Sequence, residues 1–246
     1  MKQGKRIILL KLFMLVSMAL FNVQLSSSIT DSLNGNWSQE TAIMSSTPEA
    51  DLVVRTGDLD NLNFGWPEGF DPFSGERTPA HSYPWTIDPS DPSGTDRIFV
   101  VSSYNGTPPR GSEGYTRSTS RPDNSVQSIN LSFDAKGIVI ESAIMQMFVD
   151  DFQAPVFGAR YQVKLNGVRI PAIEEVINSL DQTGPIGKMI SVEIPSEFLY
   201  LLQSGQLSID IDDPETGAGD GFAIDFLRLL INPKQIASQG IAKGRV

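Results

Sequence analysis

Acidic residues recur at three turns of this chain, and their side chains could supply oxygen ligands to a hard cation. Asp58 and Asp60 lie in a Thr-Gly-Asp-Leu-Asp-Asn turn, Asp213 follows an alternating run, and Asp220 and Asp225 flank the start of the last apolar segment. Ca²⁺ binds about six to eight oxygens in flexible geometry, many of them from carboxylates and loop carbonyls. We therefore predict that these five residues are ligands of a Ca²⁺ ion.

A second interpretation of the same acids stays open. Asp and Gly also form turns in which the Asp side chain bonds to nearby backbone amides. None of the three segments follows the EF-hand pattern, because Asp58 and Asp60 lack the following Gly and the distal Glu. In favour of a metal, carboxylates gathered at one end of a domain would repel one another unless a cation or an Arg neutralised them.

The stretch from residue 58 to residue 96 combines these acids with aromatic rings and many Pro and Gly residues. A loop this long in a compact domain is usually functional, disordered or braced, and its aromatic content argues against simple disorder. Trp66, Phe70, Tyr83 and Trp85 are predicted to bind a ligand, because sugar rings dock on aromatic faces while neighbouring polar groups take the hydroxyls. The alternative is that these rings pack as lids on the domain.

Composition limits the classes of function. The 246 residues include 29 acidic and 19 basic ones, and the net charge of −10 disfavours nucleic acid and anionic membranes as partners. His81 is the only histidine and there is no cysteine, which excludes thiol catalysis and a histidine-based zinc site. Asp150 with Asp225 or Glu193 would suit glycoside hydrolysis, but so acidic a chain offers such pairs by chance. We therefore expect no enzymatic activity.

The N-terminus resembles a secretory signal peptide over residues 1–28. Lys2, Lys5 and Arg6 precede an apolar run, and small residues close the segment. A membrane anchor is the alternative, although the run is shorter than the roughly 20 residues that a span needs. No other segment reaches that length, so we expect no membrane span in the mature chain and a secreted location, periplasmic or extracellular. Without cysteine, disulfides cannot stabilise the fold.

Hydrophobic patterning predicts one β domain over residues 51–233, between a flexible leader at 29–50 and a C-terminal tail at 234–246. The predicted strands cover residues 51–57, 97–103, 128–133, 142–149, 161–166, 189–194, 206–212 and 222–231. Two short helices are predicted, at residues 172–180 and 196–203. The expected fold is an all-β, jelly-roll-like antiparallel β-sandwich with these helices and a long irregular N-terminal loop.

The order of elements from residue 142 to residue 231 resembles the jelly-roll modules of the galactose-binding-like class. A strand ending in Val-Asp-Asp is followed by Leu-Asn-Gly, by a helical Ser-Glu-Phe-Leu and by Asp-Gly-Phe-Ala-Ile-Asp-Phe. This class includes many carbohydrate-binding modules, and the resemblance does not extend to the acidic loop. It implies a structural Ca²⁺ between the start of the first strand and an acid on the last, here at Asp58, Asp60 and Asp225.

Together these features predict a secreted or envelope-associated, non-catalytic binding or adhesion module that is stabilised by Ca²⁺ and recognises carbohydrate. The alternative is a structural component of an extracellular or envelope assembly. In that case the acidic, aromatic loop at residues 58–96 would contact a protein partner.

Overall fold

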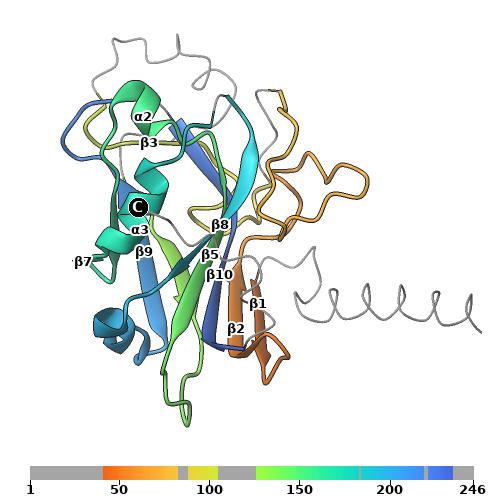
Figure 1. The fold of residues 1–246 in the computed structure, drawn as a ribbon, viewed down its shortest axis with the longest axis vertical. Coiled ribbons are helices and arrows are strands. Elements are labelled where there is room, and N and C mark those ends of the chain that lie inside the picture. The colour runs from red at the N-terminus through yellow and green to blue at the C-terminus, as the bar shows by residue number, and fades with distance from the viewer. Residues whose placement is uncertain (1–40, 83–87, 105–125, 183, 219–220, 235–246) are drawn as a thin grey trace, which may run out of the picture.

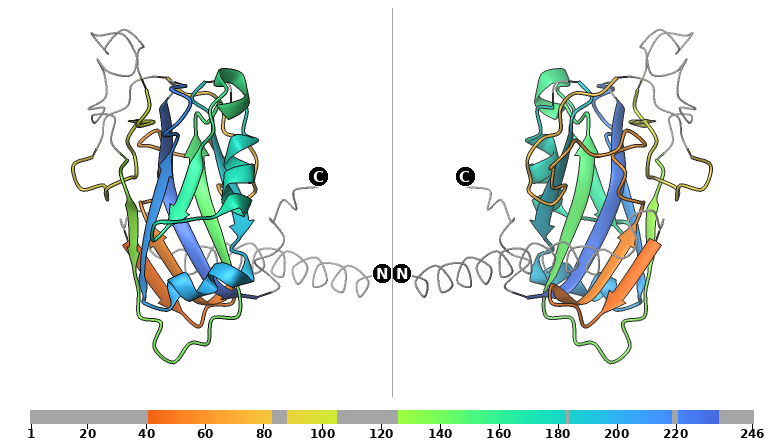
Figure 2. Two further views of the ribbon diagram at one scale, coloured as in Figure 1. Left: turned by 90° about the vertical axis from the view of Figure 1, so that its left-hand side faces the viewer. Right: turned by 90° about the vertical axis from the view of Figure 1, so that its right-hand side faces the viewer.

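The protein folds as a β-sandwich of two facing antiparallel sheets (Figures 1 and 2). The structure is a computed structural model and describes residues 41–82, 88–104, 126–182, 184–218 and 221–234. The larger sheet has the order β1 (Thr41–Ser45), β2 (Ala50–Thr56), β10 (Gly221–Pro233), β5 (Ala143–Asp150) and β8 (Gly187–Glu193), and β3 (Phe99–Val100) pairs with β10. The smaller sheet has the order β4 (Ile129–Ser132), β9 (Gln206–Asp212), β6 (Gln162–Leu165) and β7 (Val168–Arg169). The predicted all-β sandwich is confirmed, whereas its jelly-roll connectivity stays a prediction.

The main hydrophobic core fills the space between the two sheets. In β9, Leu207, Ile209 and Ile211 are buried, while Ser208 and Asp210 are partly exposed on the other face. This is the alternation that a sheet with one buried face requires. The inward residues of β9 therefore match the pattern predicted from the sequence.

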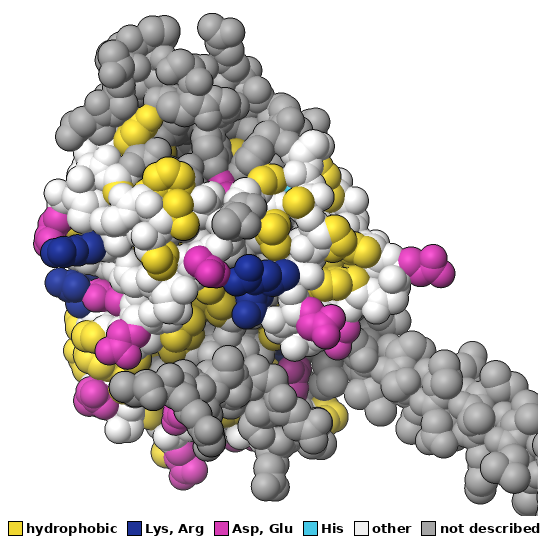
Figure 3. Space-filling model, turned by 45° about the horizontal axis from the view of Figure 1, so that its top comes forward, with side chains coloured by type: hydrophobic (Ala, Val, Ile, Leu, Met, Phe, Trp, Pro, Cys, Tyr) yellow, Lys and Arg dark blue, Asp and Glu magenta, His cyan; other side chains and the backbone are white. Residues whose placement is uncertain are grey.

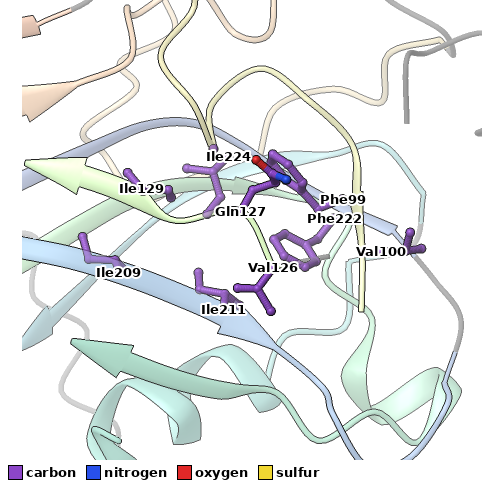
Figure 4. A pocket seen from close by; sticks show the side chains of 10 residues that line it. Phe99, Val100, Val126, Gln127, Ile129, Ile209, Ile211, Phe222 and Ile224 are labelled. Atoms are coloured by element: carbon purple, nitrogen blue, oxygen red, sulfur yellow. The ribbon is translucent and has the colours of Figure 1, made fainter. Parts of the chain in front are cut away.

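Packing between the sheets leaves little free space. Figure 4 shows a gap between the two layers that is lined largely by apolar side chains, among them Ile129, Ile209 and Phe222. Its volume is about 10 Å³, which is close to the minimum that one water molecule needs. This gap is therefore too small to hold an organic ligand.

The central strand β10 contains an irregularity that matters for the site. Its register against β5 shifts between Ile224 and Leu227, so that Asp225 and Phe226 both lie opposite the single residue Phe148. Before the shift, Ile224 faces the main core, and after it Leu227 does. A β-bulge of this kind re-aims side chains locally. It allows both Asp225 and Phe226 to face away from the core between the sheets.

The structure corrects the predicted leader. Residues 41–50 were predicted to be flexible, but they contain β1 and the first residue of β2, which pair as a hairpin. Glu49, between the two strands, forms a 2.6 Å ion pair with the buried Arg228 of β10. The alternating run at Thr41–Ser45 is short and is surrounded by Ser and Thr, so its pattern does not distinguish a strand from a flexible leader. The predicted signal peptide, the first part of the leader and the tail after Lys234 lie outside the described residues.

The helices are close to those predicted. The helical segments are α2 (Ala154–Phe157), α3 (Pro171–Asn178) and η1 (Ser196–Leu202). The helices predicted at 172–180 and 196–203 correspond to α3 and to η1, which is a 3₁₀-helix. The single turn of α2 was missed because it is too short to show a periodicity. In the described part of the chain, no helix has the length and apolar character that crossing a membrane requires.

Residues 58–82, here named the strap, cross the outer face of the larger sheet (orange in Figure 1). Aromatic residues of the strap pack on Phe148 of β5, Met189 of β8 and Phe226 of β10. These three residues alternate with neighbours that face the main core, so the strap covers the opposite side of the sheet. The strap has no helix and one isolated bridge, from Arg77 to Lys188. The predicted long irregular loop is therefore present and is packed against the sheet.

The molecular surface carries charges of both signs. Figure 3 shows, on one face, small groups of Lys and Arg side chains beside Asp and Glu, with apolar patches between them. The large apolar side chains with the greatest exposure include Val139, Val156, Phe157 and Tyr200. Val156 and Phe157 are neighbours on α2, whereas Val139 and Tyr200 lie on other segments, so these residues do not by themselves define a binding site.

Candidate metal centre

Four carboxylates meet where the strap leaves β2. Asp58, Asp60, Asp96 and Asp225 each offer one oxygen, and these oxygens all lie within 4.8 Å of one another. Asp58 and Asp60 are partly buried, whereas Asp96 and Asp225 are fully buried. The structure thus brings together Asp58, Asp60 and Asp225, which were predicted from the sequence, and adds Asp96.

Asp225 is held by the backbone of the strap. Its Oδ2 accepts a hydrogen bond of 3.2 Å from the Asn61 N–H, and its Oδ1 accepts one of 3.1 Å from the Leu62 N–H. The bulge in β10 turns the carboxylate towards these donors. The last strand and the strap therefore share one anchoring point, although they are 164 residues apart in the chain.

Asp58 and Asp60 are positioned by a tight turn at Gly57, directly after β2. Gly57 has a φ of +81°, and a Cβ at this position would lie 2.3 Å from the carbonyl oxygen of Asp225. Only glycine allows the chain to pass this close in a left-handed conformation. The requirement explains the Thr-Gly-Asp order in the sequence and places both acids beside Asp225.

The strap continues through three successive left-handed residues. Asn61, Leu62 and Asn63 have φ values of 63°, 57° and 66°. Such a conformation is unfavourable for leucine and persists only where the surroundings impose it. Here the Asp225 carboxylate accepts from the Leu62 N–H, and the Leu62 side chain is buried against Ile98 and Ala223.

Asp96 joins the cluster from the segment that precedes β3. Its backbone also has a positive φ, of 51°, and its N–H donates to the Ile224 carbonyl at 2.8 Å. Sequence reasoning counted Asp96 only as one acid of the long loop. It lies directly before the apolar run at residues 97–103, of which Phe99 and Val100 pair with the strand that carries Asp225, and this pairing cannot be read from the sequence.

Electrostatics oppose the ionisation of this cluster. Burial raises the pKa of Asp96 well above its usual range, and the negative charges of Asp225 and Asp60 raise it further. Burial likewise raises the pKa of Asp225, followed by the charges of Asp60 and Asp58, against hydrogen bonds from the strap backbone. The pKa of Asp60 is also raised by burial. A cation would remove this repulsion and allow all four groups to ionise.

A further oxygen lies next to the carboxylates in the chain. Asn61 is 4 % exposed, its backbone N–H binds Asp225 and its side-chain N–H₂ binds the Gly65 carbonyl. Its Oδ1 has no hydrogen-bond partner among the described residues. A buried amide oxygen without a partner is unfavourable in a folded protein. Amide oxygens are common Ca²⁺ ligands.

Asp213 lies elsewhere in the structure and is not part of this cluster. Its carboxylate accepts hydrogen bonds from the backbone of Arg160, Glu215 and Thr216. Burial alone would raise the pKa of Asp213, but its hydrogen bonds with Thr216 and the backbone lower it. These contacts fit the interpretation that Asp213 forms a turn, and not the prediction that it is a metal ligand of this cluster. Asp220 lies outside the described residues.

The strap aromatics that are described pack as lids. Trp66 stacks on Phe70 at 5.7 Å between centroids and meets the edge of Phe148 at 5.0 Å. Its indole N–H donates to the Leu59 carbonyl at 2.7 Å. This arrangement uses the ring and the polar group of Trp66 within the protein, which favours the packing interpretation over a sugar platform. Tyr83 and Trp85 lie outside the described residues.

Trp66→Ala is expected to destabilise the protein by about 2–3 kcal/mol, somewhat less than the cost for a fully buried tryptophan, because Trp66 is only half-buried. Urea unfolding measures this loss. Trp66→Phe, which keeps an aromatic ring, should retain most of the stability, and the exposed Tyr200 provides a control as Tyr200→Ala. Unchanged stability together with a lost glycan-array signal would instead identify Trp66 as a sugar platform.

The far end of the strap is fixed by a histidine. His81 Nε2 lies 2.9 Å from Asp150 Oδ2, and both side chains are buried. Burial raises the pKa of Asp150, while the His81 hydrogen bond and charge lower it. Asp150 therefore contacts His81, whereas Asp225 belongs to the acidic cluster and the exposed Glu193 lies near the end of β8.

Comparison of the chain with protein-family models, with curated proteins and with solved structures gives no match in any of the three. The interpretation of the site therefore depends on its own geometry.

Proposed function

We propose that this protein is an exported, non-catalytic binding module that is stabilised by Ca²⁺. The observation that carries the proposal is the convergence of four carboxylates from three separate segments within 4.8 Å, two of them fully buried. Asp58 and Asp60 come from the strap, Asp96 from the segment before β3 and Asp225 from β10. Export rests on the signal-peptide pattern of residues 1–28.

The ligand chemistry of the cluster favours Ca²⁺ among the common metals. All four side chains offer carboxylate oxygen, which suits hard cations and not the softer metals that prefer nitrogen or sulfur. Mg²⁺ demands near-ideal octahedral geometry and is usually held by one or two carboxylates together with waters. Ca²⁺ accepts more oxygens in irregular geometry, as a loop crossing the face of a sheet would provide.

The burial of the cluster supports a structural role for the ion over a catalytic one. Asp96 and Asp225 have no solvent exposure, so a substrate could not contact them while the strap is in place. The ion would stabilise the conformation of the strap and of the surface that the strap forms. Phe64 of the strap is 36 % exposed and stacks on His81 at 4.1 Å. Because the ring and the N–H of Trp66 are both used within the protein, a protein partner is favoured over a sugar docking on Trp66.

Adding Ca²⁺ to the chelated protein is expected to raise its melting temperature. A site present only in the folded state stabilises it by about 2.7 kcal/mol at a hundredfold excess of the ion over its dissociation constant. Differential scanning calorimetry in Ca²⁺ and in excess EDTA measures the shift, with Mg²⁺ as the comparison that should give less. An identical melting temperature in all three conditions would mean that the four acids bind no metal and serve only to form turns.

The same measurement has a defined pH dependence. In chelator, the raised pKa values of Asp96 and Asp225 mean that the folded state binds more protons than the unfolded state, whose carboxyls titrate near 3.8. Stability of the metal-free protein should therefore increase as the pH falls from neutrality through these raised pKa values. The Ca²⁺-induced shift should shrink over the same range, because the ion requires ionised ligands. A Ca²⁺ shift that grows on acidification would contradict this assignment.

A further inference from the structure

The strap is attached to the sheet at two ends that differ in chemistry. The end nearer to β2 is the acidic cluster, where Asn61 and Leu62 donate to Asp225. At the far end, the Thr78 N–H donates to the Gly187 carbonyl at 2.9 Å and the His81 N–H donates to Pro185 at 3.0 Å. Only the first end would depend on a metal ion.

Between these ends the strap contacts the sheet mainly through side chains. Its backbone hydrogen bonds there are local, from Phe70 to Pro67 and from Ser74 to Asp71. Trp66, Phe70 and Phe73 are only partly buried where they pack over the sheet. Leu59 and Leu62 are buried, so the strap packs most deeply beside the acidic cluster. Segments with local hydrogen bonds and shallow apolar contacts open more readily than a folded core.

The sheet beneath does not need the strap for its main packing. The core between the two sheets is a separate cluster from the one that the strap covers. Opening of the strap would also relieve the left-handed conformation of Leu62, which the contacts at the cluster impose. Opening of the strap would therefore expose Phe148 and Phe226 but leave the core between the two sheets in place.

We propose that residues 58–76 of the strap form a cation-dependent flap, which closes when the acidic cluster is occupied and opens on the far end, residues 77–82, when the cation is removed. This inference rests on the proposed function, because it takes the cluster as the cation site. Opening would expose the aromatic face formed by Phe148 and Phe226, which the closed strap covers.

Hydrogen–deuterium exchange of the full chain, read by mass spectrometry in Ca²⁺ and in excess EDTA, tests the flap. Peptides within residues 58–76 should exchange at least tenfold faster in EDTA. Peptides from β9 and from residues 77–82 should change less than twofold. Asp225→Asn in Ca²⁺ should reproduce the EDTA pattern, while Glu76→Gln, which removes an exposed strap charge away from the cluster, should behave as wild type.

Isothermal titration calorimetry of the same samples tests Ca²⁺ binding separately from opening of the flap. Ca²⁺ binding without any change in strap exchange would overturn the flap and leave the cation site intact. Faster exchange in β9 as well as in the strap would also overturn it, because the whole sandwich would then be unfolding. Absence of Ca²⁺ binding heat together with an unchanged melting temperature would overturn the proposed function itself.

Discussion

Replacing Asp225 by asparagine is expected to abolish the stabilisation of this protein by Ca²⁺, a loss of about 2.7 kcal/mol at a hundredfold excess of the ion. Asp225 accepts hydrogen bonds from the strap backbone and is one of the two fully buried carboxylates of the cluster. Asparagine has nearly the same shape but lacks the charge and keeps only one of the two acceptor oxygens, so the part of the loss that depends on Ca²⁺ would report on the ion.

In chelator, Asp225→Asn should not show the loss of stability that it shows in Ca²⁺. Without a cation, Asp225 suffers the repulsion of Asp58 and Asp60, and a neutral amide removes it. This gain offsets the backbone hydrogen bond that the amide nitrogen of asparagine cannot accept. Asp225→Asn should therefore differ little from wild type in EDTA at neutral pH and be clearly less stable in Ca²⁺. Asp213→Asn serves as the control, because it weakens a turn away from the cluster and should cost the same in both buffers. Calorimetric melts decide the matter, and a Ca²⁺ shift of wild-type size in Asp225→Asn would exclude Asp225 as a ligand.

Glu49→Gln is expected to destabilise the fold by about 3–5 kcal/mol, the usual cost of removing one partner from a buried ion pair. Arg228 is 1 % exposed, its Nη2 lies 2.6 Å from Glu49 Oε2, and its guanidinium carbon lies 4.6 Å from the centre of the Phe73 ring. Burial lowers the pKa of Arg228, against the charge of Glu49. The buried Arg55 stands directly opposite Arg228 on β2, so the loss of Glu49 would leave two adjacent cationic groups with less compensation.

A matched control for this variant lies two residues away. Asp51 pairs with Lys234 at 3.4 Å, and both side chains are about half exposed. Exposed pairs contribute roughly 0–1 kcal/mol, so Asp51→Asn should leave stability nearly unchanged. Urea unfolding compares the two variants. If Glu49→Gln cost as little as Asp51→Asn, the ion pair with Arg228 would be solvated instead of buried.

The sequence predicted the sandwich well where apolar residues alternate. In β9 and β5 the inward positions matched the pattern because both strands bury one face in the main core, and periodicity reports such burial directly. The hairpin of β1 and β2 was missed because Thr41–Ser45 is short and polar at its ends. Its stability comes from pairing along β2 and from the Glu49 ion pair, which are tertiary contacts that no local pattern encodes.

The candidate site was predictable only in part. Asp58 and Asp60 could be found because they follow a glycine at the end of a strand, and Asp225 because it interrupts an apolar run. Asp96 could not be distinguished from the other acids of its loop, since its place depends on how β3 pairs with β10. Asp213 shares the Asp and Gly surroundings of the others but lies in a turn of its own.

The bulge in β10 lets one strand supply both a carboxylate to the acidic cluster and an aromatic contact to the strap. Asp225 and Phe226 occupy a position where a regular strand would have one residue, and the inward positions shift from Ile224 to Leu227 across them. Deleting either residue would straighten the strand without moving the core out of phase. A deletion that removed Phe226 would keep the acid, and one that removed Asp225 would keep the aromatic contact with the strap. The one extra residue in the central strand therefore allows β10 to carry both the Asp225 carboxylate and the Phe226 ring on the side of the strap.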